Sequence, residues 1–351
     1  MPYIINVAIT VVLGLLYNAS DKSEENKKRY LIVIWICLSL VAGLRGAYAL
    51  GDTEGYRSSY LRAASMDFPT FFKTFKIDSG FYYLHWACSK IGIPWQAYLL
   101  LISFFVLGTF CYWIYENSED VVASMIIFEA MFLTVWMGSL RQDVAMALLL
   151  IALMLEKRGV KKIFLIGIIV VAVLFHSTAL IVLVYIPLRM IPINKISVAF
   201  FAAFSVFAFV FRNNFLSGIN SIASLLGRTT YENFYKDNPT NLIFLTAVIA
   251  CLAIFSMSFI IENYPQVERY FCTIFIMLAF LALGGGAIVR LAWYFGPFFC
   301  VMLPVILKRF KPYGLAISLA MGILIILYLR GVDTTTYYFF WNETRMLLEG
   351  I

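Results

Sequence analysis

Long apolar runs, separated by short polar segments, form the dominant pattern along the chain. A membrane-spanning helix needs about 20 mostly apolar residues, with a range of roughly 17–25. The pattern therefore predicts an all-α, polytopic integral membrane protein with about ten full spans. The expected spans are 2–17, 30–50, 95–115, 120–138, 139–156, 195–211, 241–261, 267–285, 288–307 and 312–330. The first run lacks the Lys/Arg-rich start of a signal peptide, so we expect a retained helix there.

The apolar run at 162–189 is long enough for one tilted helix, but His176 and Ser177 interrupt its middle. A single span there would place one of three short basic segments outside, against the positive-inside rule. Two half-length helices, 163–175 and 178–189, place all three inside, and each half is shorter than the roughly 30 Å hydrocarbon core. We therefore expect a broken or re-entrant pair with His176 near its tip. The three basic segments are 27–29, 157–162 and 308–311.

This arrangement predicts that both termini lie outside. The outer side then holds two loops, 51–94 and 212–240, and a tail, 331–351. The chain shows no linker, internal repeat or insert of soluble-domain size. We expect a single transmembrane domain over 1–351, with these outer segments framing a site.

Composition excludes several function classes. Hydrophobic residues make up 62% of the chain, charged residues 13%, and the mean hydropathy is +0.86. A soluble domain has roughly 45–50% apolar and about 25% charged residues. A soluble enzyme, a disordered chain and a nucleic-acid module are therefore excluded. The net charge of +7 suits a membrane protein with basic cytoplasmic loops. With two histidines and scattered cysteines, we expect no metal site and no cofactor.

Arginines lie at or near the outer ends of several expected helices: Arg45, Arg141, Arg290 and Arg330. An arginine at this depth can extend to lipid headgroups, and for Arg330 we favour that interpretation. Arg290 follows a run of three glycines, which predicts a tight turn between two helices and could also shape a pocket.

Arg141 occupies the first turn of an expected helix. Ser139 and Gln142 around it fit a capping box. A cation there is disfavoured by about 0.3–1 kcal/mol, because the macrodipole is positive at that end. An arginine together with unpaired first-turn amides makes an anion site. Asp143 points to another side of this helix, where it is a dipole partner or a candidate base.

The outer loop at 51–94 combines carboxylates, hydroxyls and aromatic rings, among them Asp52, Glu54, Tyr56 and Tyr82. Such a set suits a sugar, because rings stack on C–H faces and carboxylates bind hydroxyl groups. An aromatic belt at the membrane interface is the alternative for the tyrosines. His176 is either a buried structural residue or a proton-transfer group, since the pKa of an imidazole lies near 6.5.

The order of these motifs resembles that in the EpsG family of Wzy-type bacterial polysaccharide polymerases, whose products are O antigen, capsule or exopolysaccharide. Asp78 stands where the family commonly has a glutamate. The motifs that carry the resemblance are Gly43-Leu44-Arg45, Gly51-Asp52-Thr53-Glu54-Gly55-Tyr56, Asp78-Ser79-Gly80-Phe81-Tyr82-Tyr83-Leu84, Leu140-Arg141-Gln142-Asp143-Val144-Ala145, Phe175-His176-Ser177-Thr178-Ala179-Leu180 and Val289-Arg290-Leu291-Ala292-Trp293-Tyr294-Phe295.

The resemblance implies a multi-pass glycosyltransferase of the bacterial inner (cytoplasmic) membrane. It would join oligosaccharide repeat units carried on undecaprenyl pyrophosphate, with its active site facing the periplasm or exterior. Its partners would be the lipid-linked oligosaccharide, the bilayer, a chain-length regulator and a flippase, and no nucleic acid. Neither a metal nor another cofactor is implied.

For the reaction, we expect arginines to hold the departing pyrophosphate and a base to activate the acceptor hydroxyl. The arginines are Arg141 and Arg290, with Arg45 beside them. The candidate bases, in order of preference, are His176, Asp52 and Asp143. The other substrate contacts expected are Glu54, Tyr56, Gln142, Tyr82 and Tyr294.

Three other classes share parts of this pattern. A transporter or flippase of a lipid-linked glycan would use the same arginines and no base, and broken helices occur in transporters too. A ligase would move the glycan onto another lipid without extending it. A structural subunit of an envelope assembly would do neither.

Overall fold

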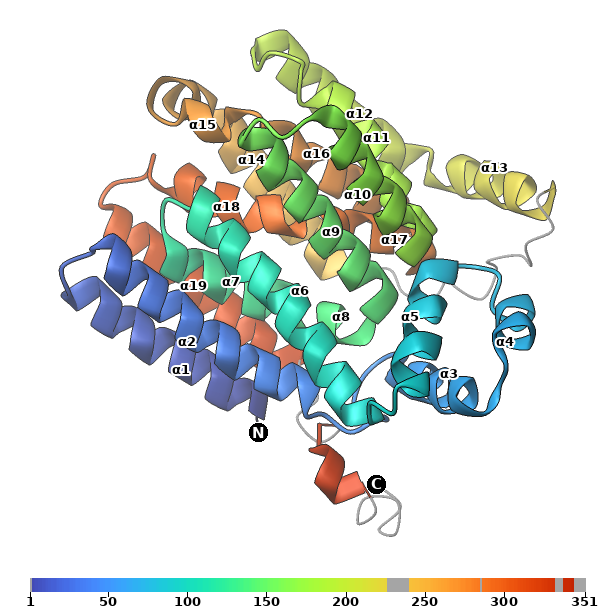
Figure 1. Ribbon diagram of the computed structural model, residues 1–351. Coiled ribbons are helices and arrows are strands. Elements are labelled where there is room, and N and C mark those ends of the chain that lie inside the picture. Colours follow the sequence, from blue (N-terminus) through green and yellow to red (C-terminus); the bar gives the residue numbers. More distant parts are fainter. Residues whose placement is uncertain (1, 226–239, 285, 332–336, 344–351) are drawn as a thin grey trace. The chain divides into compact units, whose positions relative to one another are not determined.

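A computed structural model describes residues 2–225, 240–284, 286–331 and 337–343 (Figure 1). Parts of the expected outer loop 212–240 and of the tail 331–351 lie outside the described residues. Within the described part, the secondary structure is helical, and extended backbone pairs only at an antiparallel bridge between Arg45 and Phe339. The all-α fold class is confirmed.

Helices lie at every expected span. Among the described residues, five segments are long and apolar enough by themselves to cross a membrane, and five shorter apolar helices accompany them. The chain is a polytopic membrane protein. The helices at the expected spans are α1 (Pro2–Ala19), α2 (Glu24–Gly43), α6 (Trp95–Asn117), α7 (Val121–Met131) with α8 (Leu133–Gly138), α9 (Leu140–Lys157), α12 (Lys195–Val210), α14 (Thr240–Asn263), α16 (Phe271–Leu283), α17 (Gly286–Ala292) with α18 (Gly296–Leu307), and α19 (Tyr313–Gly331).

Three expected boundaries differ from the structure. The helix expected at 30–50 ends at Gly43, where the side chain of Arg45 bonds the carbonyl of Ala42 and the backbone turns away. The span 120–138 is divided at Phe132. The span 288–307 is divided by the short 3₁₀ helix η3 (Trp293–Phe295), after which α18 begins with a proline in its first turn.

The segment 51–94, which the sequence predicts to lie outside, folds into three short helices: α3 (Thr53–Ser65), α4 (Phe68–Thr74) and α5 (Ser79–Lys90). Helices α3 and α5 pack together around His85, which is fully buried among aromatic rings, with Phe81 at 4.3 Å and Tyr98 at 5.1 Å between ring centroids. Ser59 Oγ lies 3.3 Å from His85 Nδ1. Burial lowers the pKa of His85 to about 3, so this histidine is a neutral core residue of the segment 51–94.

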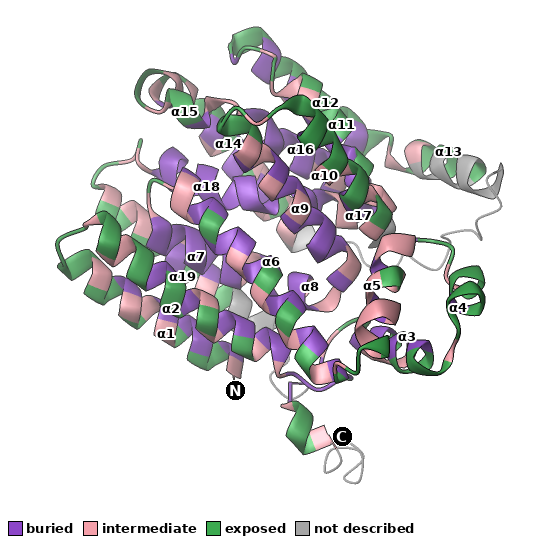
Figure 2. Ribbon diagram, viewed as in Figure 1, coloured by how far each residue is buried: buried purple, intermediate pink, exposed green. Residues whose placement is uncertain are grey.

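The described chain forms two compact units, each considered by itself: residues 1–180 with 319–351, and residues 181–318. In the first unit, α1 packs on α2 and α7, α2 packs on α6, and α6 packs on α9. Helix α10 (Lys162–Phe175) packs on both α9 and α5. In the second unit, α16 contacts α12, α14 and α18, and all of α18 is buried (Figure 2). The single transmembrane domain over 1–351 stays a prediction.

The expected break at His176 is confirmed. Helix α10 ends at Phe175, and His176 has extended backbone, with φ −156° and ψ 117°. A 3₁₀ helix, η1 (Ser177–Ile181), and α11 (Val182–Leu188) follow. The re-entrant course of this pair stays a prediction.

Candidate functional site

Two of the three basic segments meet at one end of the first unit. Lys27, near the start of α2, lies over the ring of Tyr115 at 4.7 Å from its centroid. Lys157, at the end of α9, donates to Asn117 Oδ1 at 3.2 Å. The start of α9 lies at the opposite end of the unit, because 18 residues of helix span about 27 Å.

At that opposite end, Asp78 joins two residues that the sequence singles out. Its Oδ2 accepts a hydrogen bond from Arg141 Nη1 at 2.8 Å and lies 2.9 Å from His176 Nδ1. Its Oδ1 accepts from the backbone N–H of Ser177 at 3.1 Å. The Asp78 side chain is 2% exposed, whereas those of Arg141 and His176 are 23% and 15% exposed. The carboxylate is therefore enclosed, and its two partners retain an accessible edge.

The local backbone aims the Asp78 carboxylate at these partners. Asp78 has a left-handed conformation, with φ 55° and ψ 44°, and its side chain makes no capping bond to α5. Aspartate is among the few residues other than glycine that tolerate this region. Gly80 lets α5 approach the end of α10, since a Cβ there would lie 3.0 Å from Leu174 Cβ and 3.1 Å from its carbonyl carbon.

The contacts of Asp78 define the charge state of the site. Burial would raise the pKa of this carboxyl, but the hydrogen bond and charge of His176, the charge of Arg141 and the Ser177 N–H together hold it below its ordinary value. An ionised carboxylate only accepts hydrogen bonds, so Nδ1 of His176 carries a proton. Nε2 is then the nitrogen that can exchange a proton with a ligand.

Two aromatic rings surround the guanidinium of Arg141. Its Nε lies 3.5 Å from Tyr56 Oη, and its Cζ lies 5.6 Å from the Tyr56 ring centroid and 5.8 Å from that of Tyr82. Burial raises the pKa of Tyr56 to about 12, so the phenol is neutral. The rings hold the cation by cation–π attraction without neutralising it.

The capping box expected around Arg141 is wrong. Ser139 precedes α9 with φ −125° and ψ 49°, and its side chain makes no capping hydrogen bond. Gln142 is buried, at 2% exposed, and so is Asp143, at 1%. Both side chains point into the protein, so a direct substrate contact by either stays a prediction.

Arg45 is fully buried, unlike Arg141. Its guanidinium bonds the carbonyls of Ala42 and Met137 and lies 3.2 Å from Thr53 Oγ1. It thereby ties the end of α2 to the turn before α9 and to the start of α3. Its predicted role in pyrophosphate binding is untested, and these contacts favour a positioning role.

Of the loop carboxylates Asp52 and Glu54, Asp52 lies beside the turn that precedes α9. Asp52 is exposed, and its backbone N–H donates to the carbonyl of Gly138 at 3.3 Å. Gly51 has φ 51° and packs so closely on Gly138 that a Cβ would lie 2.9 Å from the Gly138 Cα. Glu54 Oε1 accepts from Ser58 Oγ at 2.6 Å. Their predicted roles stay predictions.

Residues 337–343 of the tail fold back against the same end of the first unit. The N–H of Gly46 donates to the carbonyl of Tyr338 at 2.9 Å, and Arg57 pairs with Glu343 at 2.7 Å. Arg290, in the last turn of α17, and Tyr294, in η3, belong to the second unit. Their approach to Arg141 stays a prediction.

Asp78 is the residue whose role sequence reasoning missed. In the sequence it is one carboxylate among several in the outer loop, and its motif indicates only sugar contacts. The sequence does indicate that some carboxylate is needed here, because Arg141 and His176 both require a counter-charge when they are partly buried. No spacing in the sequence selects Asp78 for that role over Asp52 or Glu54.

A comparison with known protein families gives a match over residues 28–342, which includes every predicted site residue. The chain belongs to the EpsG family. This family is associated with polysaccharide polymerases of the glycosyltransferase type. No curated protein and no solved structure matches the chain.

Proposed function

We propose that this EpsG-family protein polymerises oligosaccharide repeat units carried on undecaprenyl pyrophosphate, at the outer face of the inner membrane. The observation that supports this proposal is the meeting of Arg141 and His176 at Asp78. The meeting point is at the end of the first unit opposite two basic segments. The positive-inside rule assigns those segments to the cytoplasm and hence the cluster to the outer side.

In the proposed reaction, the acceptor hydroxyl oxygen attacks the anomeric carbon of the growing chain. The bond from that carbon to the pyrophosphate oxygen breaks, and the pyrophosphate leaves with the electron pair. His176 Nε2 takes the hydroxyl proton as general base. Asp78 stays ionised, orients the imidazole through Nδ1 and stabilises the imidazolium that forms.

Arg141 is proposed to stabilise the leaving pyrophosphate. A guanidinium has five N–H donors in a planar fork, and within the described residues its contacts to Asp78 and Tyr56 involve Nη1 and Nε. The second terminal nitrogen, Nη2, is proposed to donate to phosphate oxygens. Such donors act most strongly where charge develops in the transition state and water is excluded.

Reconstitution tests this function. The purified full-length protein, in vesicles with lipid-linked repeat units, should yield glycans of increasing length. Transfer to a different lipid without extension would indicate a ligase, and movement of unextended substrate across the bilayer would indicate a flippase. Either result in place of elongation would overturn the polymerase proposal.

Arginine variants test the site in the same assay. Arg141→Ala should abolish elongation, and Arg141→Lys should lower it by at least about 100-fold, because a point ammonium does not replace the planar fork. Arg62→Ala, which removes an exposed arginine from the same outer segment, is the matched control and should keep wild-type activity. Wild-type chain-length ladders from Arg141→Ala would refute the role of this residue.

A further inference from the structure

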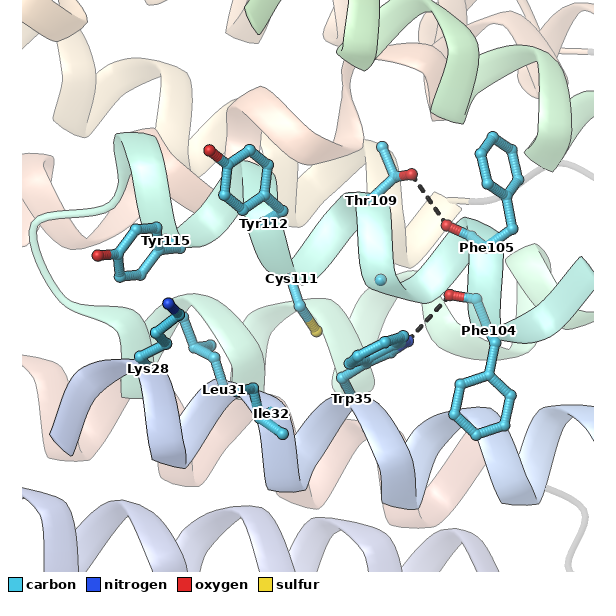
Figure 3. Close-up of a pocket in the computed structure, with 11 residues that line it drawn as sticks. Lys28, Leu31, Ile32, Trp35, Phe104, Phe105, Thr109, Cys111, Tyr112 and Tyr115 are labelled. Carbon is cyan, nitrogen blue, oxygen red and sulfur yellow. Dashed lines mark hydrogen bonds between the residues drawn. The ribbon is translucent and has the colours of Figure 1, made fainter. Parts of the chain in front are cut away.

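An apolar groove runs between α2 and α6 on the surface of the first unit (Figure 3). Its volume is about 360 Å³, within the range of small-molecule sites. Ile32 on α2 and Phe105 and Tyr112 on α6 line it and are 41%, 39% and 40% exposed. In a membrane protein, such exposed apolar side chains face the hydrocarbon of the bilayer.

Along the middle of this groove, the side-chain polar groups of Trp35 and Thr109 are bonded within the protein. Trp35 Nε1 donates to the carbonyl of Phe104 at 2.9 Å, and Thr109 Oγ1 donates to that of Phe105 at 2.9 Å (Figure 3). The indole of Trp35 packs so closely on Gly108 that a Cβ there would lie 2.9 Å from it. The groove therefore offers an apolar surface to an apolar occupant.

One end of the groove carries an available positive charge. Lys28 lies there with Tyr112 and Tyr115 (Figure 3). Its neighbours are paired, Lys27 with Glu24 at 3.6 Å and Arg29 with Glu25. Lys28 is exposed and has no ion pair within the part of the chain that the structure describes. The carboxylates at this end have other partners: Glu116 accepts from Tyr112 at 3.0 Å and pairs with Arg158, and Glu24 pairs with Lys27. An anionic group at this end would meet Lys28 as a cation without an ion pair among the described residues.

The length of the groove matches one leaflet. The α6 side of the lining extends from Phe104 to Tyr115, about 16 Å at 1.5 Å per residue. Half of the bilayer hydrocarbon core measures about 15 Å. A helix from another protein would be about 10–12 Å in diameter, which is too wide to lie within a groove of about 360 Å³.

We propose that this groove binds an anionic phospholipid, with one acyl chain along α2 and α6 and the phosphate at Lys28. The lipid belongs to the leaflet at the basic end of the first unit. This site shares no residue with the Asp78 cluster and does not depend on the proposed function.

Native mass spectrometry of the full-length protein, titrated with phosphatidylglycerol or phosphatidylcholine, tests the headgroup contact. Wild-type protein should retain phosphatidylglycerol preferentially. Lys28→Ala should weaken phosphatidylglycerol binding about fivefold and leave phosphatidylcholine binding unchanged, as expected for one lysine near an anionic lipid. Lys22→Ala, which removes an exposed lysine from the preceding loop, should bind like wild type. Equal phosphatidylglycerol binding by Lys28→Ala and wild type would overturn the proposal.

A second pair of variants tests the acyl-chain contact. Ile32→Trp should fill the groove and reduce retention of both lipids. Ile36→Trp, on the same helix at 40% exposure but outside the groove, is the control and should retain them. Cooperative thermal unfolding of both variants in lipid-free detergent is the check that they are folded. Equal lipid retention by the two variants would contradict a lipid site. So would a dimer of the wild-type protein that Ile32→Trp abolishes and Ile36→Trp does not, because the groove would then be a contact between two copies of the chain.

Discussion

Asp78 holds Arg141 and His176 through one enclosed carboxylate oxygen. A carboxylate shared by two cationic or titratable partners is favoured in its charged form, which explains why its pKa is lowered despite burial. The same contact determines which imidazole nitrogen carries a proton. A single acidic residue therefore sets both the position and the protonation of the proposed base.

Asp78→Asn should keep the shape of this contact and remove its charge. We expect elongation to fall by about 100-fold or more, because the imidazole loses the anion that orients it and stabilises its protonated form. The control is Asp67→Asn, which changes an exposed carboxylate in the same segment, 51–94. Near-normal turnover of Asp78→Asn would show that Asp78 does not position the base.

The same variant gives a pH test of stability. Because folding lowers the pKa of Asp78 below its ordinary 3.8, its ionised form stabilises the protein above that pH. This contribution is lost as the pH falls below 3.8 and through the folded pKa. The difference in thermal unfolding temperature between wild type and Asp78→Asn should shrink as the pH falls below 3.8. A difference independent of pH would mean that the carboxylate charge is not responsible.

Among helices, the close approach of α5 to the end of α10 places Asp78 beside His176. Gly80 makes this approach possible, and the extended backbone of His176 ends α10 at that point. Packing of α10 on both α9 and α5 brings the three site segments together. The position of the site thus depends on one glycine contact and one helix break.

Gly80→Ala should displace the end of α10 by a few tenths of an ångström, because the added Cβ meets backbone atoms of Leu174 at 3.1 Å. We expect elongation to fall on the order of tenfold with the protein still folded, since catalysis is sensitive to small misplacements. Gly55→Ala adds the same methyl group in α3 with nothing within 4 Å, and should be neutral or slightly stabilising. The elongation assay and thermal unfolding of the two variants provide the comparison.

At the scale of the molecule, the first unit has a basic end and an end that carries the Asp78 cluster. The two ends of α9 place them about 27 Å apart, close to the thickness of the hydrocarbon core. The proposed orientation has the basic end in the cytoplasm and the cluster near the outer interface, where the proposed substrate, a lipid-linked pyrophosphate, would be accessible.

Alkaline phosphatase fusions test this orientation, because the enzyme is active only outside the cytoplasm. A fusion after Ile351 should be active, and a fusion after Arg158, in the basic segment that follows α9, should be inactive. The opposite pattern would place the cluster in the cytoplasm and contradict the proposed access to outer substrates. Immunoblots of both fusions provide the expression control.

Individual residues show how far sequence could predict the site. Arg141 is identifiable because a cation in the first turn of a helix is unfavourable, and His176 because it interrupts an apolar run. Asp78 is not, since local sequence does not distinguish it from Asp52 and Glu54. Arg45 resembles Arg141 in sequence, yet it is fully buried against backbone carbonyls.

The apolar runs alone determined the all-α membrane fold and the approximate helix positions, because the bilayer requires long apolar segments with paired backbone groups. The break at His176 followed from the polar interruption together with the basic segments and the positive-inside rule. The family followed from the order of short motifs. Only the tertiary structure decided which carboxylate meets Arg141 and His176, and which arginine is buried. Those choices depend on the packing of α5, α9 and α10 and on the backbone conformation of Asp78, contacts between segments far apart in the chain that no local pattern encodes.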